Sequence, residues 1–492
     1  MMQYRSRSII LALLPIVLIT GACSHTIPQA ATKPVPPPIT SAVPSFAAMN
    51  KEQPKAPLSQ VPLHIRTDLT PVQSAIREAI PERFTEAGHA LEKDFRWTFV
   101  RNGQPQVRIQ DGLVAVHAEY KGDIETRGGA RTCRLDPVYS TLDATGKLVL
   151  VQDRESVAFS FEPAQVTVGL KPESDGRCNM FNIPVKDQLP ELFSISEAKT
   201  ALAESVQPDT FNIPFQRLWD DLGGPLSVPV SALNTRACFY GNPREVMLGQ
   251  QRGTTQETII SGFARQMPVI SFEQSCTEAP PTTALVNSGT PAPDSKPFMI
   301  LAKIPLSYAT LSHQVQSKLF HQTLVLDSAG SESAIIERVS ATDANGRILL
   351  AVETSGDLKG TIYYWGTPRL DDNGKTLSVP DLQMANESRT ALDTIRVGYW
   401  QMVDRELKTK LRQAVTTDFS PQIDQMKQAI TGKHTVGTMT MDILVTGQQP
   451  DQAHSTPQAL IATILLQGTA SAHGNITVED NGTRAPSRQE TR

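Results

Sequence analysis

The side chains that perform acid–base or metal chemistry in enzymes are scattered along this chain. Only His313 and His321 fall on one predicted helix, and eight residues separate them by about 12 Å along its axis, too far to chelate one metal ion directly. The nine histidines are His25, His64, His89, His117, His313, His321, His434, His454 and His473. The sequence therefore predicts no histidine metal site.

Two acidic patterns also favour structural roles. Asp371-Asp372-Asn373-Gly374 begins like a calcium loop, but no glutamate occupies the twelfth position, so it predicts a hairpin turn. The similar stretch 143–147 predicts another hairpin turn. Asp220 and Asp221 are adjacent near a predicted helix end, where neighbouring side chains point about 100° apart and make a poor acid–base pair.

Recognised catalytic motifs are missing from the sequence. There is no Gly-x-Ser-x-Gly elbow, no Gly-x-x-x-x-Gly-Lys phosphate loop and no His-Glu-x-x-His. We therefore expect no catalytic residues, cofactor or metal, and a protein that is not an enzyme.

The cysteines suggest lipid attachment and disulfides. The chain has five of them, and none forms a Cys-x-x-Cys pair. With Cys23 set aside, four remain, which allow three pairings. We favour Cys133 with Cys178 and Cys238 with Cys276, since each pair falls in a separate β-rich segment; free buried thiols are the alternative.

Residues 1–22 have the pattern of a secretory signal. Arg5 and Arg7 precede a short apolar run from 9 to 20, too short to span a bilayer, and small residues lead up to Cys23. A cysteine at the cleavage point resembles a bacterial lipoprotein signal, although Thr20 stands where leucine is usual. The expectation is a lipid on Cys23, and the alternative is ordinary cleavage after Ala22.

The predicted anchor indicates a location. A lipidated Cys23 would attach the protein to a membrane of the cell envelope, facing the periplasm. Ser24, rather than the aspartate that tends to retain lipoproteins at the inner membrane, favours the inner leaflet of the outer membrane.

Composition describes a folded body behind a tether. The chain has 46 basic and 50 acidic residues and no Lys/Arg-rich run, which argues against nucleic-acid binding. Eight prolines between 24 and 57 predict a disordered tether over 23–57, with a reach of roughly 100 Å. A Pro/Ser/Thr linker at 279–297 separates two predicted α+β modules, 58–278 and 298–480, and the tail 481–492 is expected to be disordered.

A weak internal repeat relates the two predicted modules. Val61–Ile65, a short strand before a helix, resembles Ile304–Tyr308 in the second half. The turn at Asp111-Gly112 corresponds to the turn at Asn345-Gly346. Because these matches keep their order, we expect two modules related by duplication.

Apolar residues at helical spacing are the candidate ligand-binding residues. A helix starting at a Thr70 cap and a single long helix spanning 392–415 each present one apolar stripe, which must face a sheet. The first stripe holds Leu69, Val72, Ile76 and Ile80, and the second holds Leu392, Ile395, Tyr399, Val403, Leu407 and Leu411.

Residues 58–478 resemble an uncharacterised bacterial lipoprotein family, domain of unknown function four-four-zero-three. The resemblance rests on the strand at 61–65, on Asp111-Gly112 to Gly122-Asp123, and on the segments 219–225, 244–249 and 262–272. The family implies no activity.

The order of elements is also similar to the tubular lipid-binding (TULIP) domains of bactericidal/permeability-increasing proteins. That resemblance implies an α+β fold of two tandem modules, each a curved antiparallel sheet wrapped on amphipathic helices, with a gap for acyl chains. A solid core is the alternative.

We therefore expect a non-enzymatic envelope protein that binds or transfers a lipid or a lipid-linked envelope component. The alternative is a tethered scaffold or assembly factor that binds proteins through its surface, and a hydrolase with an unrecognised site comes third. Its predicted partners are the membrane, through the anchor, and a lipid ligand; the sequence identifies no protein partner.

Overall fold

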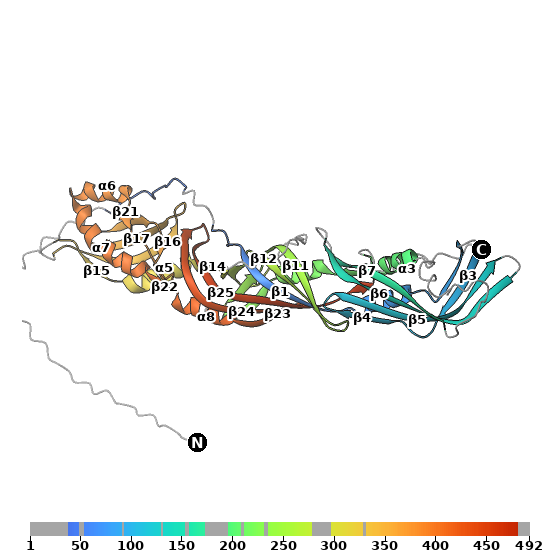
Figure 1. Ribbon diagram of the computed structural model, residues 1–492. Coiled ribbons are helices and arrows are strands. Elements are labelled where there is room, and N and C mark those ends of the chain that lie inside the picture. Colours follow the sequence, from blue (N-terminus) through green and yellow to red (C-terminus); the bar gives the residue numbers. More distant parts are fainter. Residues whose placement is uncertain are drawn as a thin grey trace, which may run out of the picture.

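A computed structural model describes most of the chain. The described residues are 38–48, 54–90, 93–128, 131–152, 157–172, 195–207, 211–230, 235–277, 297–327 and 331–480. They form a long molecule, mostly sheet, with a central sheet in the middle and curled half-barrel sheets towards its ends (Figure 1). Within these ranges, no helix is both long and apolar enough to cross a bilayer. The predicted signal, Cys23, Cys178, the segment 278–296 and the tail 481–492 lie outside them.

Both halves of the chain build the ten-stranded central sheet. It holds β1 (Ser59–Asp68), β9 (Leu226–Val230), β10 (Thr235–Tyr240), β11 (Pro243–Gly253), β12 (Thr258–Gln266), β13 (Val269–Glu273), β14 (Phe298–Ser307), β23 (Gly432–Val436), β24 (Met439–Ser455) and β25 (Ala459–Thr477). The long strand β25 pairs with β24 on one edge, and with β14 and then β1 on the other. Strands β1 and β14 start side by side and run in opposite directions, joined where Ser59 Oγ accepts from Met299 N at 3.0 Å.

The shared sheet corrects the expectation of a separate antiparallel sheet in each module. Strands β1 and β25 pair in parallel, and so do β13 and β14, so each half completes the other. Alternating apolar residues show that a strand has a buried face, but they do not identify its partner strand. The duplication itself stays a prediction.

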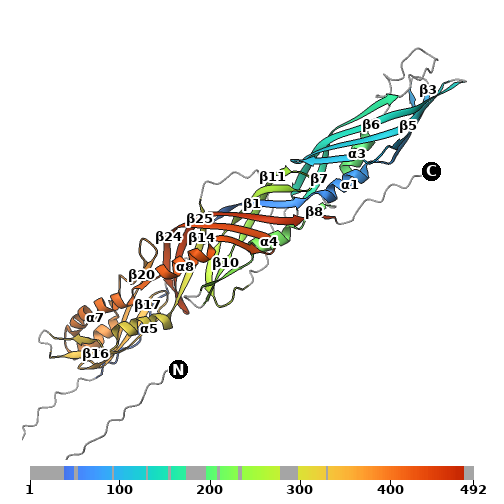
Figure 2. The ribbon, with the colours of Figure 1, turned by 90° about the horizontal axis from the view of Figure 1, so that it is seen from below.

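The first end of the molecule is a wide sheet covered by short helices, at the right of Figure 1. Its strands are β2 (Arg83–Ala90), β3 (Lys93–Arg101), β4 (Gln106–Gln110), β5 (Leu113–Gly128), β6 (Arg131–Gln152), β7 (Val157–Pro172), β8 (Phe211–Ile213) and β26 (Glu479–Asp480). The helices here are α1 (Thr70–Ala79) and α3 (Ile195–Glu204), while α4 (Phe215–Gly223) contacts the central sheet. Figure 2 shows α1 and α3 along this sheet from below.

Local details at this end agree with the sequence in part. The predicted turn between β4 and β5 is present, with positive φ at Asp111 (51°) and Gly112 (75°). The predicted hairpin at 143–147 is wrong, because these residues lie inside β6 and pair with both β5 and β7. The predicted Thr70 cap is also corrected: the Asp68 carboxylate accepts from the Thr70 backbone N–H at 2.8 Å, so Asp68 satisfies the first turn of α1.

The second end, at the left of Figure 1, combines short strands with more helix. One sheet holds β15 (Thr323–Val325), β16 (Ser333–Asp343), β17 (Ile348–Gly356), β18 (Gly360–Gly366) and β21 (Gln383–Met384), and another holds β19 (Arg369–Leu370), β20 (Thr376–Ser378) and β22 (Thr417–Asp418). The helices are α5 (Tyr308–Leu319), α6 (Asn386–Ile395), α7 (Tyr399–Val415) and α8 (Ser420–Ile430).

The predicted long helix over 392–415 is two helices. Helix α6 ends at Ile395, and Gly398 adopts a left-handed conformation (φ 76°) before α7 begins. Its backbone N–H donates to Asp393 Oδ1 at 2.9 Å, which fixes the turn. Apolar spacing continues across the break, so periodicity alone could not reveal it.

Candidate ligand-binding surfaces

The four predicted ligand-binding residues of the first half lie in the core beneath α1. Leu69, Val72, Ile76 and Ile80 are each at most 1% exposed. Gln73, on the same helix, donates through Nε2 to the Val107 carbonyl at 2.6 Å and so fixes α1 against β4. The structure brings this set together as packing residues.

Two apolar side chains near the end of β7 are less covered than the rest of the first-end sheet, and sequence analysis did not identify them. On β7, Phe159 and Phe161 are buried where α3 packs, and Val166 is 8% exposed. Further along, Val168 and Leu170 are only half-buried, although they belong to the same alternating row as Val166. The buried positions change from odd to even numbers at a bulge around Ala164, so period-two alternation within 166–170 was the signal that could have found them.

The helices at the first end are much shorter than the longest strand of the sheet that they cover. Helices α1 and α3 have 10 residues each, about 15 Å, whereas β6 has 22 residues and spans about 70 Å. Two strands away, on β5, the Tyr120 hydroxyl donates to the Pro81 carbonyl at 3.0 Å, and burial raises the pKa of Tyr120. Tyr120 therefore stays neutral and adds no charge to an apolar surface.

The second predicted set packs a filled core. Leu392, Val403, Leu407 and Leu411 have no exposed surface and Tyr399 is 3% exposed. Helices α5 and α7 pack together, and Gln314 Nε2 joins them by donating to the carbonyls of Ala414 (3.2 Å) and Thr416 (3.1 Å). Ile395 alone of the six is half-buried.

Ile395 faces a cavity of about 650 Å³ between α6 and an N-terminal segment. We call this segment, residues 38–48, the strap; it lies inside the range expected to be a disordered tether. Its contacts correct that expectation, since Ile39 N donates to the Lys359 carbonyl at 2.6 Å and Ser41 Oγ lies 3.1 Å from Ser388 Oγ. Proline-rich composition did not reveal the few side chains that dock it.

The strap ends in an aromatic contact. The Phe46 ring lies 5.2 Å from that of Trp365, and the Arg347 guanidinium lies over both rings, 5.5 and 5.0 Å from their centroids. The strap thus runs along the second end from Gly360, where Ile39 forms a parallel bridge, towards the turn beyond β16.

A smaller cavity of about 390 Å³ lies where the first sheet meets β11. Its wall combines Leu148, Leu248 and Gln251 with the turn at Asp111-Gly112. Gln152 Nε2 donates across this junction to the Leu248 carbonyl at 2.9 Å. The wall of this cavity therefore mixes polar and apolar groups.

The acidic motifs serve the fold. Asp371 Oδ1 accepts from the backbone N–H groups of Lys375 (2.7 Å) and Thr376 (3.0 Å), so its carboxylate closes the predicted turn. Asp221 Oδ2 accepts from Thr438 N at 2.7 Å and holds α4 to the turn before β24. Across the described ranges, histidine, cysteine and acidic side chains form no cluster of three that could hold a metal ion.

Two histidines meet in the central sheet. His64 on β1 stands opposite His473 on β25, with ring centroids 5.3 Å apart. Burial, and secondarily the neighbouring His473, lower the pKa of His64. Sequence reasoning missed this pair because the two residues come from opposite ends of the chain.

One predicted disulfide is confirmed. Cys238 and Cys276 are bonded, closing a separation of 38 residues at the edge of the central sheet. The other predicted pair stays a prediction, because Cys178 and the Cys133 side chain lie outside the described residues.

Comparisons with known proteins come from sequence and structure. The model of the domain of unknown function DUF4403 matches residues 57–473. No curated protein matches the sequence.

Two solved structures show a distant likeness. A crystal structure of lipopolysaccharide binding protein shares 11% identity, covering 84% of this chain and 98% of that one, at a TM-score of 0.23. A crystal structure of P47 of Clostridium botulinum E1 shares 10% identity, covering 85% and 100%, at a TM-score of 0.18. These TM-scores are too low to support an argument about this chain.

Proposed function

We propose that this chain, which belongs to the DUF4403 family, binds an apolar ligand without catalysing a reaction. The ligand is a lipid or a lipid-linked envelope component. In this proposal Cys23 carries a lipid, and the body faces the periplasm from the inner leaflet of the outer membrane.

The observation that supports ligand binding is that the apolar side chains become less buried along β7. Val166 is only 8% exposed, whereas Val168 and Leu170, in the same alternating row, are half-buried. Apolar surface exposed to water costs about 25 cal/mol per Å², so a contiguous apolar row favours an apolar occupant. An acyl chain can lie along such a row because it needs no polar partners.

A tethered scaffold is the second candidate. The core beneath α7 favours it, since Val403, Leu407 and Leu411 have no exposed surface there that a ligand could contact. The two candidates differ at the first end, where only the lipid-binding proposal needs Val168 and Leu170.

The test is binding of a fluorescent fatty acid, cis-parinaric acid, to the full chain in detergent-free buffer. We expect saturable binding that weakens at least tenfold in a Val168→Glu, Leu170→Glu variant, because carboxylates make the row polar. Half-buried sites tolerate this change better than the fully buried Val72, where a larger side chain would overpack the core.

A matched control carries Val325→Glu and Ile335→Glu, an exposed apolar pair at the second end. The control should bind the probe like the natural chain. Absent probe binding, or equal binding by both variants, would overturn the lipid proposal in favour of the scaffold.

A further inference from the structure

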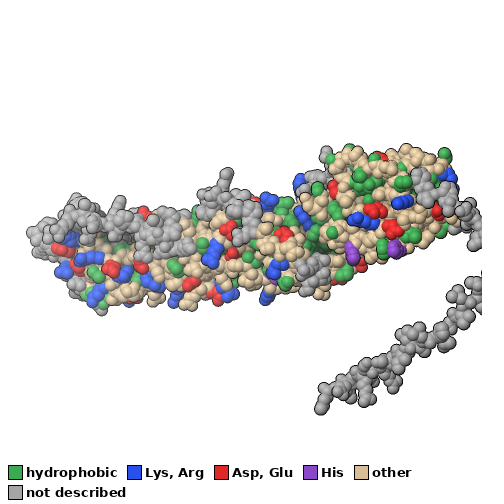
Figure 3. Space-filling view, turned by 180° about the vertical axis from the view of Figure 1, so that it is seen from behind, with side chains coloured by type: hydrophobic (Ala, Val, Ile, Leu, Met, Phe, Trp, Pro, Cys, Tyr) green, Lys and Arg blue, Asp and Glu red, His purple; other side chains and the backbone are tan. Residues whose placement is uncertain are grey.

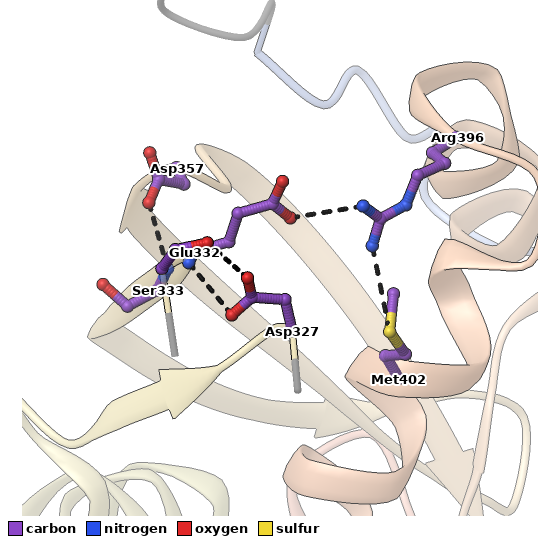
Figure 4. Close-up of polar contacts among 7 residues, drawn as sticks. Asp327, Glu332, Ser333, Asp357, Arg396 and Met402 are labelled. Carbon is purple, nitrogen blue, oxygen red and sulfur yellow. Dashed lines mark hydrogen bonds and ion pairs between the residues drawn. The ribbon is translucent and has the colours of Figure 1, made fainter. Parts of the chain in front are cut away.

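Three turns meet at the outer extremity of the second end, which we call the distal tip. They are the β15–β16 turn, the β17–β18 turn and the α6–α7 turn. Arg396 Nη1 lies 3.6 Å from Glu332 Oε2, and this ion pair joins the α6–α7 turn to the β15–β16 turn (Figure 4). Asp357 Oδ2 accepts from Ser333 N at 3.0 Å and joins the two strand turns. These contacts hold the tip as one surface.

The distal tip exposes large apolar side chains. Val397, in the α6–α7 turn, is 93% exposed, and Val325 and Ile335 on the β15–β16 hairpin are 47% and 38% exposed. Val325 pairs with Ser333, and Ile335 pairs with Thr323. The side chains of Val325 and Ile335 are therefore diagonal neighbours on one face of the sheet. Seen from behind, this end is at the right of Figure 3, with hydrophobic side chains among charged ones.

The strap brings the N-terminal part of the chain to the same extremity. Ile39 forms its bridge with Gly360, directly after the β17–β18 turn, and Pro38 lies against α6. Fifteen residue steps separate Cys23 from Pro38, which span at most about 50 Å. If the strap were not docked and residues 23–57 were all extended, the tether would reach about twice as far.

The opposite end lies too far away to share this position. Strands β25 and β6 follow one another along the molecule (Figure 1) and span about 60 and 70 Å. A lipid on Cys23 therefore keeps the distal tip within about 50 Å of the bilayer, whereas the first end is not held there by the tether.

We propose that the distal tip rests on the bilayer that holds the anchor, with Val397, Val325 and Ile335 entering its surface. This inference rests on the proposed anchor at Cys23. Tethering keeps the tip at a high effective concentration near the lipid, so three exposed side chains suffice for contact. The ligand-binding row then faces away from the membrane of attachment.

Charge at the tip is mixed. Asp327, Glu332 and Asp357 lie beside Arg396 and Lys359, so the described residues of the tip form no basic patch that could bind anionic lipid. The contact is therefore apolar and should not weaken in high salt, unlike binding through lysine and arginine.

The test reconstitutes the full lipidated chain into phosphatidylcholine vesicles that contain a phospholipid with a photoactivatable acyl chain. Cross-linked peptides are then identified by mass spectrometry. We expect the peptides of the α6–α7 and β15–β16 turns to be labelled at least tenfold more than those holding Val100 and Leu113, which are at least as exposed as Val325 and Ile335 but lie at the first end. Labelling should be the same in 1 M salt.

Variants sharpen this test. Val397→Glu with Val325→Glu should reduce tip labelling severalfold, whereas the matched Leu113→Glu with Val100→Glu should leave it unchanged; exposed sites make misfolding a minor concern. Equal labelling at both ends, or labelling unaffected by the tip variant, would overturn the inference. The intact mass of the same sample reports acylation. A missing acyl group would overturn the anchor and this inference together, whereas an acylated chain with an unlabelled tip overturns the inference alone.

Discussion

The two ends of the molecule share a helix–strand–turn arrangement and differ in how completely helices cover the sheet. In each, a glutamine on the first helix bonds to a neighbouring strand: Gln73 to the Val107 carbonyl, and Gln316 to the Glu337 carbonyl at 3.0 Å. A turn with positive φ follows both strands, at Asp111-Gly112 and at Asn345-Gly346.

Strand length separates the two ends. Strand β6 has 22 residues against 10 each in α1 and α3, whereas β16, the longest strand described in the second-end sheet, has 11 residues against 12 in α5 and 17 in α7. A helix covers only about 1.5 Å of sheet per residue, while a strand extends it by about 3.3 Å. The comparison suggests that the first end has apolar surface for a ligand and that the second end has a filled core suited to attachment.

Removing the Cys238–Cys276 disulfide should have the largest effect, because both ends depend on the shared sheet. The closed loop of 38 residues predicts a loss of about 4 kcal/mol when both cysteines become alanine. Urea unfolding followed by circular dichroism measures it. A separate early transition for one end would show that the ends fold independently and would break the comparison.

Leu407→Ala and Ile76→Ala compare the two cores directly. Each residue is fully buried, and each change should cost about 2–5 kcal/mol in protein stripped of lipid. Adding lipid should change the cost of Ile76→Ala, because a cavity beneath α1 would alter the lipid affinity of the first end, and leave that of Leu407→Ala unchanged. Urea unfolding with and without lipid checks this; equal responses would mean that the two cores are alike.

Phe46→Ala should release the strap at a cost of about 1–2 kcal/mol, from the lost aromatic and cation–π contacts with Trp365 and Arg347. Hydrogen exchange should quicken in residues 38–48 and β18 and stay unchanged in the first sheet. Val43→Ala, at a 67% exposed strap residue, is the control. Faster exchange in both ends would contradict a strap that acts on the second end alone.

The His64–His473 pair predicts the smallest effect, a loss of stability in acid. The folded-state pKa of His64 lies below its unfolded value, so its contribution is complete above pH 6.5 and is lost as pH falls from there through the lowered pKa. Unfolding free energies measured between pH 7.5 and 5 should fall less steeply in His64→Gln. His473→Gln, which removes the neighbouring charge, should have a smaller influence; an unchanged slope in His64→Gln would rule the pair out.

Local features of the fold were predictable from sequence, and long-range ones were not. Apolar spacing placed α1, and glycine chemistry placed the turns at 111–112 and 345–346. The parallel pairing of β1 with β25 joins residues about 400 positions apart, and no local pattern encodes it. Gly398 broke a stripe that spacing alone predicted to be continuous.

The candidate site divides in the same way. Periodicity found residues that are buried, such as Val72 and Val403, because it reports which side of a helix faces the core. It does not report whether that core is filled. Half-burial at Val168 and Leu170, and the docking of the strap through Phe46, depend on lengths and contacts that only the folded chain sets.

Native mass spectrometry of the chain secreted into an oxidising periplasm, combined with lipid extraction, tests the central claim most directly. The account predicts a reproducible bound lipid mass that is lost in Val168→Trp and retained in the matched Val325→Trp. A ligand-free mass across several gentle preparations of the natural chain would contradict lipid binding and leave the tethered scaffold as the better account.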